Sequence, residues 1–225
     1  MYSVGYVSRF MEEPREEHLA AVKRILRYVA GTLHLGCSFN RWKTGDPQLL
    51  GFSDSDMAGD VDDRKSTTGT FFFPERCPIS CSSLKQKVVA LSSCEAEYIA
   101  AAMAACQGVW LARLLAEVRG GEPARVKINV DNKSAISLCK NLMLHEGSKH
   151  IDTKYHSIRD CIEDGRIEVD FFPTGDQLAD VLTKPLGRAV FQELRDTSGV
   201  VEVKTQTSGL GGAMLASLDN PEAFS

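Results

Sequence analysis

The sequence lacks several features that would place it in a specialised class of protein. No apolar run approaches the roughly 20 residues that a membrane-spanning helix needs, and Met1 to Arg9 lack the apolar core of a signal peptide. The seven cysteines include no Cys-x-x-Cys pair, and there is no internal repeat. We therefore expect reduced core thiols in an intracellular, cytoplasmic protein that has no membrane partner.

The composition is that of an ordinary globular protein. Of the 225 residues, 43% are hydrophobic and 25% are charged, and the net charge is −4. This length allows one substantial domain and a smaller appendage. The small negative charge argues mildly against a free-standing nucleic-acid binder, although metal-binding carboxylates also make an active site acidic.

The two ends of the chain differ from its middle. Residues 1–48 contain seven basic and five acidic side chains, and apolar residues at helical spacing predict a helix over Glu16 to Gly31. Its basic residues form either a solvated helix face or a contact to a nucleic-acid backbone. Residues 196–225 are rich in Ser, Thr and Gly, so we expect a disordered tail. The predicted organisation is a helical segment at 1–48, a main domain at 49–195 and this tail.

The main domain shows strand patterns followed by alternating helix and strand patterns. Short apolar runs predict strands at 49–54, 70–73, 79–82, 126–130 and 166–172, with a further short strand at 87–91. Helices are predicted over about 92–118, 134–140, 150–163 and 176–195, the last kinked or divided at Pro185. We therefore predict an α/β fold with a five-stranded mixed sheet, in which three antiparallel strands precede strand–helix alternation and helices flank the sheet.

Four carboxylates fall at the ends or starts of these elements. Asp54 ends the first strand, Asp131 follows the strand at 126–130, and Asp180 lies in the last helix. Glu97 falls in the first turn of a helix that Ser92 and Glu95 open as a capping box. Strand ends beside helix starts share one edge of a sheet, where α/β folds place ligands. Because Mg²⁺ prefers oxygen ligands, the four acids are candidates to bind two ions that hold a phosphodiester in line for hydrolysis.

Six motifs occur in an order that resembles a known family, the ribonuclease H domain of copia-type LTR retrotransposon Pol polyproteins. They are Gly51–Asp60, Asp63–Gly69, Ser92–Tyr98, Val130–Ala135, Lys149–His156 and Asp176–Pro185. The resemblance covers about Leu49 to Leu194. Residues 1–48 resemble the segment that follows the polymerase core in the same polyproteins, so the chain resembles a C-terminal polyprotein fragment.

The resemblance implies the ribonuclease H fold and a metal-dependent endonuclease that cleaves the RNA strand of RNA–DNA hybrids during reverse transcription. It implies Mg²⁺, or Mn²⁺, as cofactor, and the hybrid and the reverse transcriptase portion of the polyprotein as partners, within a virus-like particle. The residues that match the four catalytic and metal-binding positions are Asp54, Glu97, Asp131 and Asp180. Glu95 competes with Glu97, which we prefer because capping already explains Glu95. Substrate contacts are expected from Asn132, Lys133, Ser134, His150 and His156.

Other functions fit the sequence less well. Asp60 to Asp63 superficially resembles a polymerase metal motif but lacks its aromatic residue, and an integrase would need a glutamate where Arg166 stands. A zinc site built from Cys139, Cys161 and the nearby histidines matches no zinc-binding spacing. The alternative that stays open is a catalytically silent, domesticated or decayed fragment that only binds nucleic acid.

Overall fold

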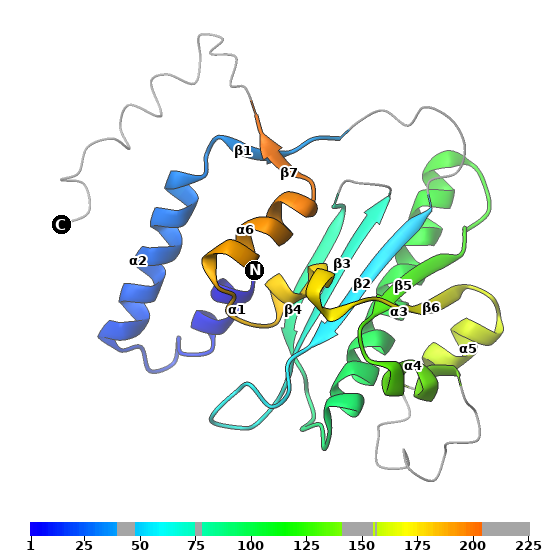
Figure 1. The fold of residues 1–225 in the computed structure, drawn as a ribbon, viewed down its shortest axis with the longest axis horizontal. Helices are drawn as coiled ribbons and strands as arrows, with labels where there is room; N and C mark the ends of the chain where they lie inside the picture. Colours follow the sequence, from blue (N-terminus) through cyan, green and yellow to red (C-terminus); the bar gives the residue numbers. More distant parts are fainter. Residues whose placement is uncertain (40–47, 75–77, 141–154, 156, 204–225) are drawn as a thin grey trace.

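The computed structural model describes residues 1–39, 48–74, 78–140, 155 and 157–203 (Figure 1). The helices and strands, in chain order, are α1 (Tyr2–Ser8), α2 (Glu16–Gly31), β1 (Leu35–Cys37), β2 (Leu49–Ser55), β3 (Thr67–Pro74), β4 (Ser80–Lys85), α3 (Ser93–Arg119), β5 (Val126–Val130), α4 (Lys133–Lys140), α5 (Ser157–Glu163), β6 (Ile167–Phe171), the 3₁₀ helices η2 (Thr174–Asp176) and η3 (Leu178–Leu182), α6 (Arg188–Thr197) and β7 (Val200–Glu202).

The main sheet has five strands in the order β4-β3-β2-β5-β6. Strands β2, β3 and β4 form an antiparallel meander, while β5 and β6 run parallel to β2 and to each other. Such parallel connections need crossover segments, which α3 and the chain containing α4 and α5 supply. The predicted five-stranded mixed sheet, with three antiparallel strands followed by strand–helix alternation, is confirmed.

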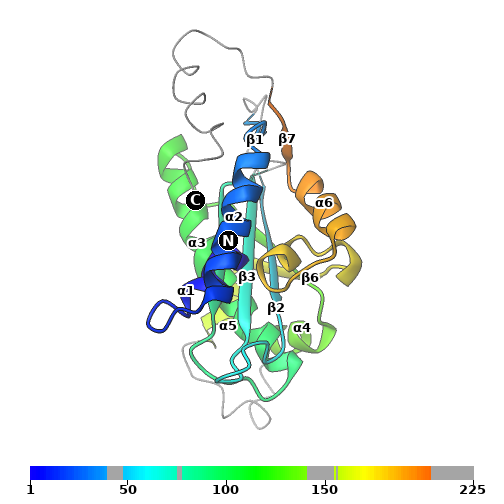
Figure 2. The ribbon, with the colours of Figure 1, turned by 90° about the vertical axis from the view of Figure 1, so that its left-hand side faces the viewer.

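Helices cover the sheet on both faces, each over its own core. Because side chains alternate along a strand, Phe72 points to the face that carries α3, α4 and α5, whereas Phe71 and Phe73 point to the other face. There they join Phe52, Leu178 and Leu194 from β2, η3 and α6. Figure 2 shows the sheet nearly edge-on, with α3 on one side and α6 on the other.

Helix α3 is the central helix of the domain, and its composition explains how closely it packs. Ala101 and Ala104 are fully buried, and a side chain at Gly108 would meet Val126 at 3.1 Å and Phe72 at 3.3 Å. The small residues thus let the helix backbone lie directly on the sheet. Among the described residues, α3 alone is long and apolar enough to cross a membrane, and more than half of that stretch is buried inside the protein.

Three expectations about secondary structure need correction. Residues 87–91 form no strand, because the chain leaves the sheet at Gln86, whose buried side-chain amide bonds Ser55, Thr68 and the Ala96 carbonyl. The helix predicted over 176–195 is instead the two 3₁₀ helices and α6, separated around Pro185. The predicted tail is ordered at its start: β7 pairs with β1, which the sequence reading missed along with α1. Residues 204–225, and residues 150–154 and 156 of the predicted helix 150–163, lie outside the described part.

The N-terminal segment lies beside the main domain rather than inside it. Neither α1 nor α2 contributes a buried residue, and the apolar stripe of α2 is largely exposed, with Leu26 at 56% and Val29 at 51%. Arg9 anchors the segment through hydrogen bonds to Asp60 and Thr67. The division of the chain at residue 48 stays a prediction.

Candidate active site

Three of the predicted carboxylates meet where β2 and β5 end and α3 begins. Oxygen atoms of Asp54, Glu97 and Asp131 all lie within 4.8 Å of one another. Asp54 and Glu97 are buried, whereas Asp131 is half-buried at the open side. The Ser55 backbone N–H donates to Glu97 Oε1 at 3.0 Å. The start of α3 is thereby fixed against the end of β2.

The capping residues separate the two glutamates of this helix. Ser92 accepts a hydrogen bond from the Glu95 N–H at 3.2 Å, and the Glu95 carboxylate accepts one from the Leu91 N–H at 2.8 Å. Glu95 is therefore turned back over the helix start, while Glu97 points to the other acids. Local capping chemistry thus assigns different positions to two glutamates that lie two residues apart.

Asp180 approaches the same cluster from the opposite face of the sheet. Lys184 Nζ lies 2.9 Å from Asp180 Oδ1 and 3.8 Å from Asp54 Oδ2, and the buried Thr183 hydroxyl donates to Asp54 Oδ2. Among the described residues, this lysine is the only cation within ion-pair distance of any of the four acids. The cluster therefore carries more negative charge than its neighbours balance.

A glycine in β3 allows the segment that carries Asp180 to dock. A side chain at Gly69 would lie 2.8 Å from the Ala179 carbonyl oxygen and 2.9 Å from Leu182 Cβ. The Ser83 hydroxyl donates to the Leu182 carbonyl at 2.6 Å and fixes the end of η3 on β4. Direct backbone contact with the sheet is therefore what holds Asp180 beside Asp54.

The crowding of these carboxylates raises their pKa values. Burial, followed by repulsion from Asp54 and Asp131, raises the pKa of Glu97 to about 9. Burial and Asp54 raise the pKa of Asp180 to about 6, and burial raises the pKa of Asp131. Burial lowers the pKa of Lys184, but the attraction of Asp54 and Asp180 raises it by more, so the net shift of this pKa is upward. The site therefore favours additional positive charge.

A second acidic cluster in the domain shows the opposite situation. Asp60 is buried, but Lys85 lies 2.6 Å and Arg9 3.0 Å from its Oδ2, and two backbone N–H groups donate to Oδ1. Burial raises the pKa of Asp60, but Lys85 and these N–H groups lower it more, so that it lies well below its usual range. Fixed cations balance this carboxylate, so the motif that superficially resembled a polymerase site has a structural role.

The cluster at Asp54, Glu97 and Asp131 fits a divalent cation. Two oxygens bound to one ion at about 2.1–2.4 Å can be at most about 4.2–4.8 Å apart, and the carboxylate oxygens lie within 4.8 Å of one another, the upper end of this range. Glu97 Oε2 is buried and has no hydrogen-bond partner in the described part of the chain. Such an orphaned buried acceptor is costly unless a cation or water completes it. The donor set is all oxygen, as Mg²⁺ and Mn²⁺ prefer.

Comparison with known proteins places the chain in a family, although no family model matches it. It is 44% identical over 199 residues to the retrovirus-related Pol polyprotein from transposon TNT 1-94 of Nicotiana tabacum, covering 88% of this chain and 15% of that one. It is also 44% identical over 202 residues to the Pol polyprotein from transposon RE1 of Arabidopsis thaliana, covering 90% of this chain and 14% of that one. The chain belongs to the Pol polyproteins of copia-type retrotransposons.

This Pol segment therefore spans about one seventh of the length of the curated relatives that it matches. Among solved structures it is similar to LC11-RNase H1, isolated from compost by a metagenomic approach. That similarity covers 66% of this chain and 99% of the other, at 16% identity and a TM-score of 0.41.

The structure describes three of the five substrate-contact residues predicted for this Pol segment. Asn132 follows Asp131 directly, and its side-chain oxygen caps α4 by accepting from the Ala135 N–H at 3.0 Å. Lys133 and Ser134 are exposed beside it, with Lys133 Nζ 4.8 Å from the centre of the Phe171 ring. Their contact with substrate stays a prediction. His150 and His156 lie outside the described residues.

Sequence reasoning missed Thr183 and Lys184 as site residues. Both belong to the motif Asp176–Pro185, and Lys184 follows Asp180 by four residues, a spacing that brings side chains together on a helix. That spacing was the available signal. The signal was overlooked because the sequence gives no reason to expect this segment to dock on β3, where Lys184 comes close to Asp54.

Proposed function

We propose that this Pol segment is a ribonuclease H that hydrolyses the RNA strand of RNA–DNA hybrids in a reaction that depends on divalent metal ions. The observation that supports it most strongly is the buried cluster of Asp54, Glu97 and Asp131. Asp180 joins it through Lys184, which contacts Asp180 and Asp54. The chain's membership in the Pol polyproteins of retrotransposons, elements whose replication passes through such hybrids, supports the choice of substrate.

Each residue of the site has a distinct task in this proposal. Asp54, Glu97 and Asp131 would hold one cation, with Glu97 Oε2 as the oxygen that lacks another partner. Asp54 and Asp180 would hold a second, after Lys184 moves away from between them. Thr183 and the Ser55 N–H orient Asp54 and Glu97 so that their free oxygens face the same point. When bound, the two ions would supply the Lewis acidity that activates a water and stabilises the leaving oxygen.

The surroundings of the site suit a hybrid rather than a small molecule. Asp131 is half-buried at the open side, with Asn132, Lys133 and Ser134 leading away from it along the protein surface. Polar groups that follow the active carboxylate in this way could bond a ribose 2′-OH, the group that distinguishes RNA from DNA. This choice of substrate-contact residues remains part of the proposal.

The test is cleavage of an end-labelled RNA–DNA hybrid in Mg²⁺ at low salt by the wild-type chain and by Asp131→Asn. We expect the wild type to cleave only the RNA strand, and the variant to lose at least about 100-fold in rate, since it removes a direct ligand. Asp164→Asn, an exposed acid outside the cluster, is the matched control and should cleave normally. Double-stranded DNA should be resistant.

A folded wild-type chain that cleaves nothing in Mg²⁺ or Mn²⁺ would overturn the proposal. The function would then be hybrid binding without catalysis, or catalysis that requires the polymerase portion of the polyprotein. Hybrid binding measured in chelator by fluorescence anisotropy separates these two results from a chain that does not recognise the hybrid.

A further inference from the structure

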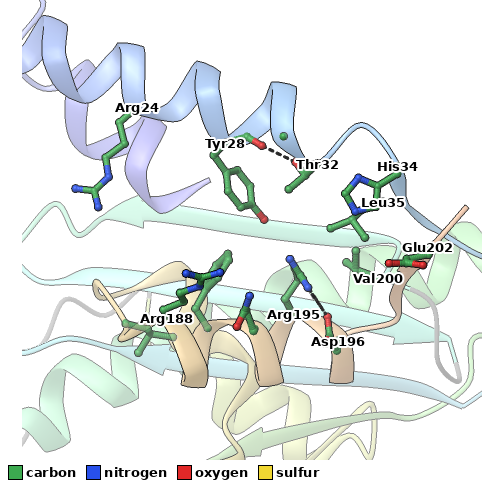
Figure 3. Close-up of a pocket in the computed structure, with 14 residues that line it drawn as sticks. Arg24, Tyr28, Thr32, His34, Leu35, Arg188, Arg195, Asp196, Val200 and Glu202 are labelled. Carbon is green, nitrogen blue, oxygen red and sulfur yellow. Dashed lines mark hydrogen bonds and ion pairs between the residues drawn. The ribbon is translucent and has the colours of Figure 1, made fainter.

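A groove separate from the carboxylate cluster runs between α2 and α6 and is closed at one end by β1 and β7 (Figure 3). Its volume is about 820 Å³, within the range of ligand-binding clefts. It brings together two segments that are more than 150 residues apart in the sequence, and its lining includes three arginines, Arg24, Arg188 and Arg195. We propose that this groove binds the phosphodiester backbone of the hybrid, an inference that rests on the proposed function and extends the nucleic-acid contact beyond the active site.

The charges in the groove are unevenly distributed. Arg195 is neutralised by Asp196, whose Oδ1 accepts from its guanidinium at 2.8 Å. Arg24 and Arg188 are exposed and form no ion pair with any described residue. Figure 3 shows both at the same end of the groove, with Glu202 and His34 at the opposite end. One end is therefore cationic and open, which is the electrostatic requirement for a phosphate contact.

The aromatic residues of the groove suit the same ligand. Tyr28 and Phe191 face each other across it in an edge-to-face contact, with ring centres 5.9 Å apart. Tyr28 is exposed and Phe191 is half-buried. Arginines beside accessible rings are typical of surfaces that follow a nucleic-acid backbone and contact its sugars or bases. A free apolar ligand would leave both arginines unused.

The cationic end of the groove is close to the active site along the chain. Arg188 follows Lys184 by four residues, which limits the distance between their Cα atoms to about 14 Å, and Lys184 contacts Asp180 directly. Leu186, between them, lines the groove. At about 3.4 Å per nucleotide along one strand, this distance corresponds to about four nucleotides. A hybrid cut at the carboxylate cluster would therefore reach the groove with the same strand or its partner.

The experiment measures hybrid binding in chelator, without cleavage, for wild type and for the double variant Arg24→Gln/Arg188→Gln. Fluorescence anisotropy with a hybrid of about 20 base pairs gives the affinity at several salt concentrations. Loss of two phosphate contacts should lower the slope of log K against log salt by nearly 2, because each contact contributes about 0.9. The affinity at low salt should fall about tenfold or more.

Two further variants show whether the groove itself is responsible. Arg113→Gln/Arg125→Gln removes the same charge from α3 and from the chain before β5, away from the groove, and should leave the slope within error of wild type. Arg24→Lys/Arg188→Lys keeps the charge and should retain most of the slope. If Arg24→Gln/Arg188→Gln binds with the affinity and slope of Arg113→Gln/Arg125→Gln, the groove is not a nucleic-acid site.

This test fails independently of the proposed function. The groove variants should also cleave more slowly at substrate concentrations below KM, with kcat nearly unchanged, since the carboxylate cluster is intact. If the wild type binds the hybrid through the groove but never cleaves it, the groove inference stands and the ribonuclease proposal falls. If it cleaves and the glutamine variant is unaffected in both assays, the groove inference falls and the ribonuclease proposal stands.

Discussion

Glu97 has the largest pKa shift among the carboxylates of the site, because it is buried beside two other acids. Its pKa of about 9 in the folded, metal-free chain compares with about 4.3 when unfolded. The folded state thus binds the proton more tightly, so Glu97 stabilises the fold below about pH 4. This contribution is lost as pH rises through the folded pKa. At pH 8 the metal-free protein should be destabilised by the cluster, and a bound cation would remove the effect.

Glu97→Gln is therefore expected to stabilise the chelated protein at pH 8–9. The free energy of unfolding should increase by an amount on the order of a few kcal/mol, and the melting temperature should rise with it. Glutamine keeps the acceptor for the Ser55 N–H, so packing is preserved. The gain should shrink as the pH falls towards 4, where the wild-type carboxyl is protonated. Thermal melts across this range test it. A variant that is less stable than wild type at every pH would contradict the assigned burial and repulsion.

Lys184 should act as an internal competitor of the metal. Its ammonium group contacts Asp180 and approaches Asp54, the two acids that would hold the second ion. Lys184→Gln should lower the free energy of unfolding of the chelated protein at pH 8. The variant should nevertheless bind Mn²⁺ about tenfold more tightly, since no fixed charge must be displaced. Titration calorimetry or paramagnetic relaxation measures this affinity. Lys127→Gln, which breaks a comparable pair with Asp170 outside the site, is the control; equal Mn²⁺ affinity in both variants would refute the competition.

At the level of elements, the contact between β3 and η3 decides where Asp180 lies. Gly69→Ala would place a methyl group 2.8 Å from a backbone oxygen, so η3 must move. We expect a loss of about 1–3 kcal/mol in stability and a fall in cleavage rate of more than tenfold, because Asp180 would leave Asp54. Gly121→Ala, where nothing lies within 4 Å, is the control. Unchanged activity in Gly69→Ala would show that this docking does not position the carboxylate.

The same elements show what could be predicted from sequence. The helix at Glu16–Gly31 matched to the residue, and α3 was predicted within about one residue at each end, because periodicity, capping and glycine act locally. The order of the four acids was also readable, since three follow strands or open a helix. The strand predicted at 87–91 and the helix at 176–195 failed for tertiary reasons. Gln86 finds buried partners across three elements, and η3 packs on a glycine that is distant in sequence.

Pairing between distant segments escaped prediction for the same reason. The strands β1 and β7 have three residues each, too short for alternation to be informative, and they form only because their partner is present. Lys184 was overlooked because its role depends on Asp54, 130 residues earlier in the chain. Local signals thus identify the acids, whereas the cations that balance them are set by the fold.

For the whole molecule, the question is how much of the chain the carboxylate site needs. The first 39 residues contribute no buried residue from α1 or α2. They contact the main domain through Arg9, through the β1–β7 pair and through the rings of Tyr28 and Phe191. In contrast, Leu194 of α6 is 5% exposed and belongs to the core beneath the sheet. The N-terminal segment should therefore be dispensable for folding, and α6 should not.

A chain that starts at Gln48 is expected to fold, with a melting temperature lowered by only a few degrees, since a loss of about 1 kcal/mol shifts it by roughly 2–4 °C at this size. A chain that ends at Gly187 loses Leu194 and Phe191 and should be destabilised by several kcal/mol, or fail to fold. Circular dichroism melts compare the two. The chain that starts at Gln48 should keep Mn²⁺ binding, because all four carboxylates remain. It should bind the hybrid more weakly, because it lacks Arg24. If it unfolds as readily as the C-terminal truncation, residues 1–47 are an integral part of the domain rather than an appendage to it.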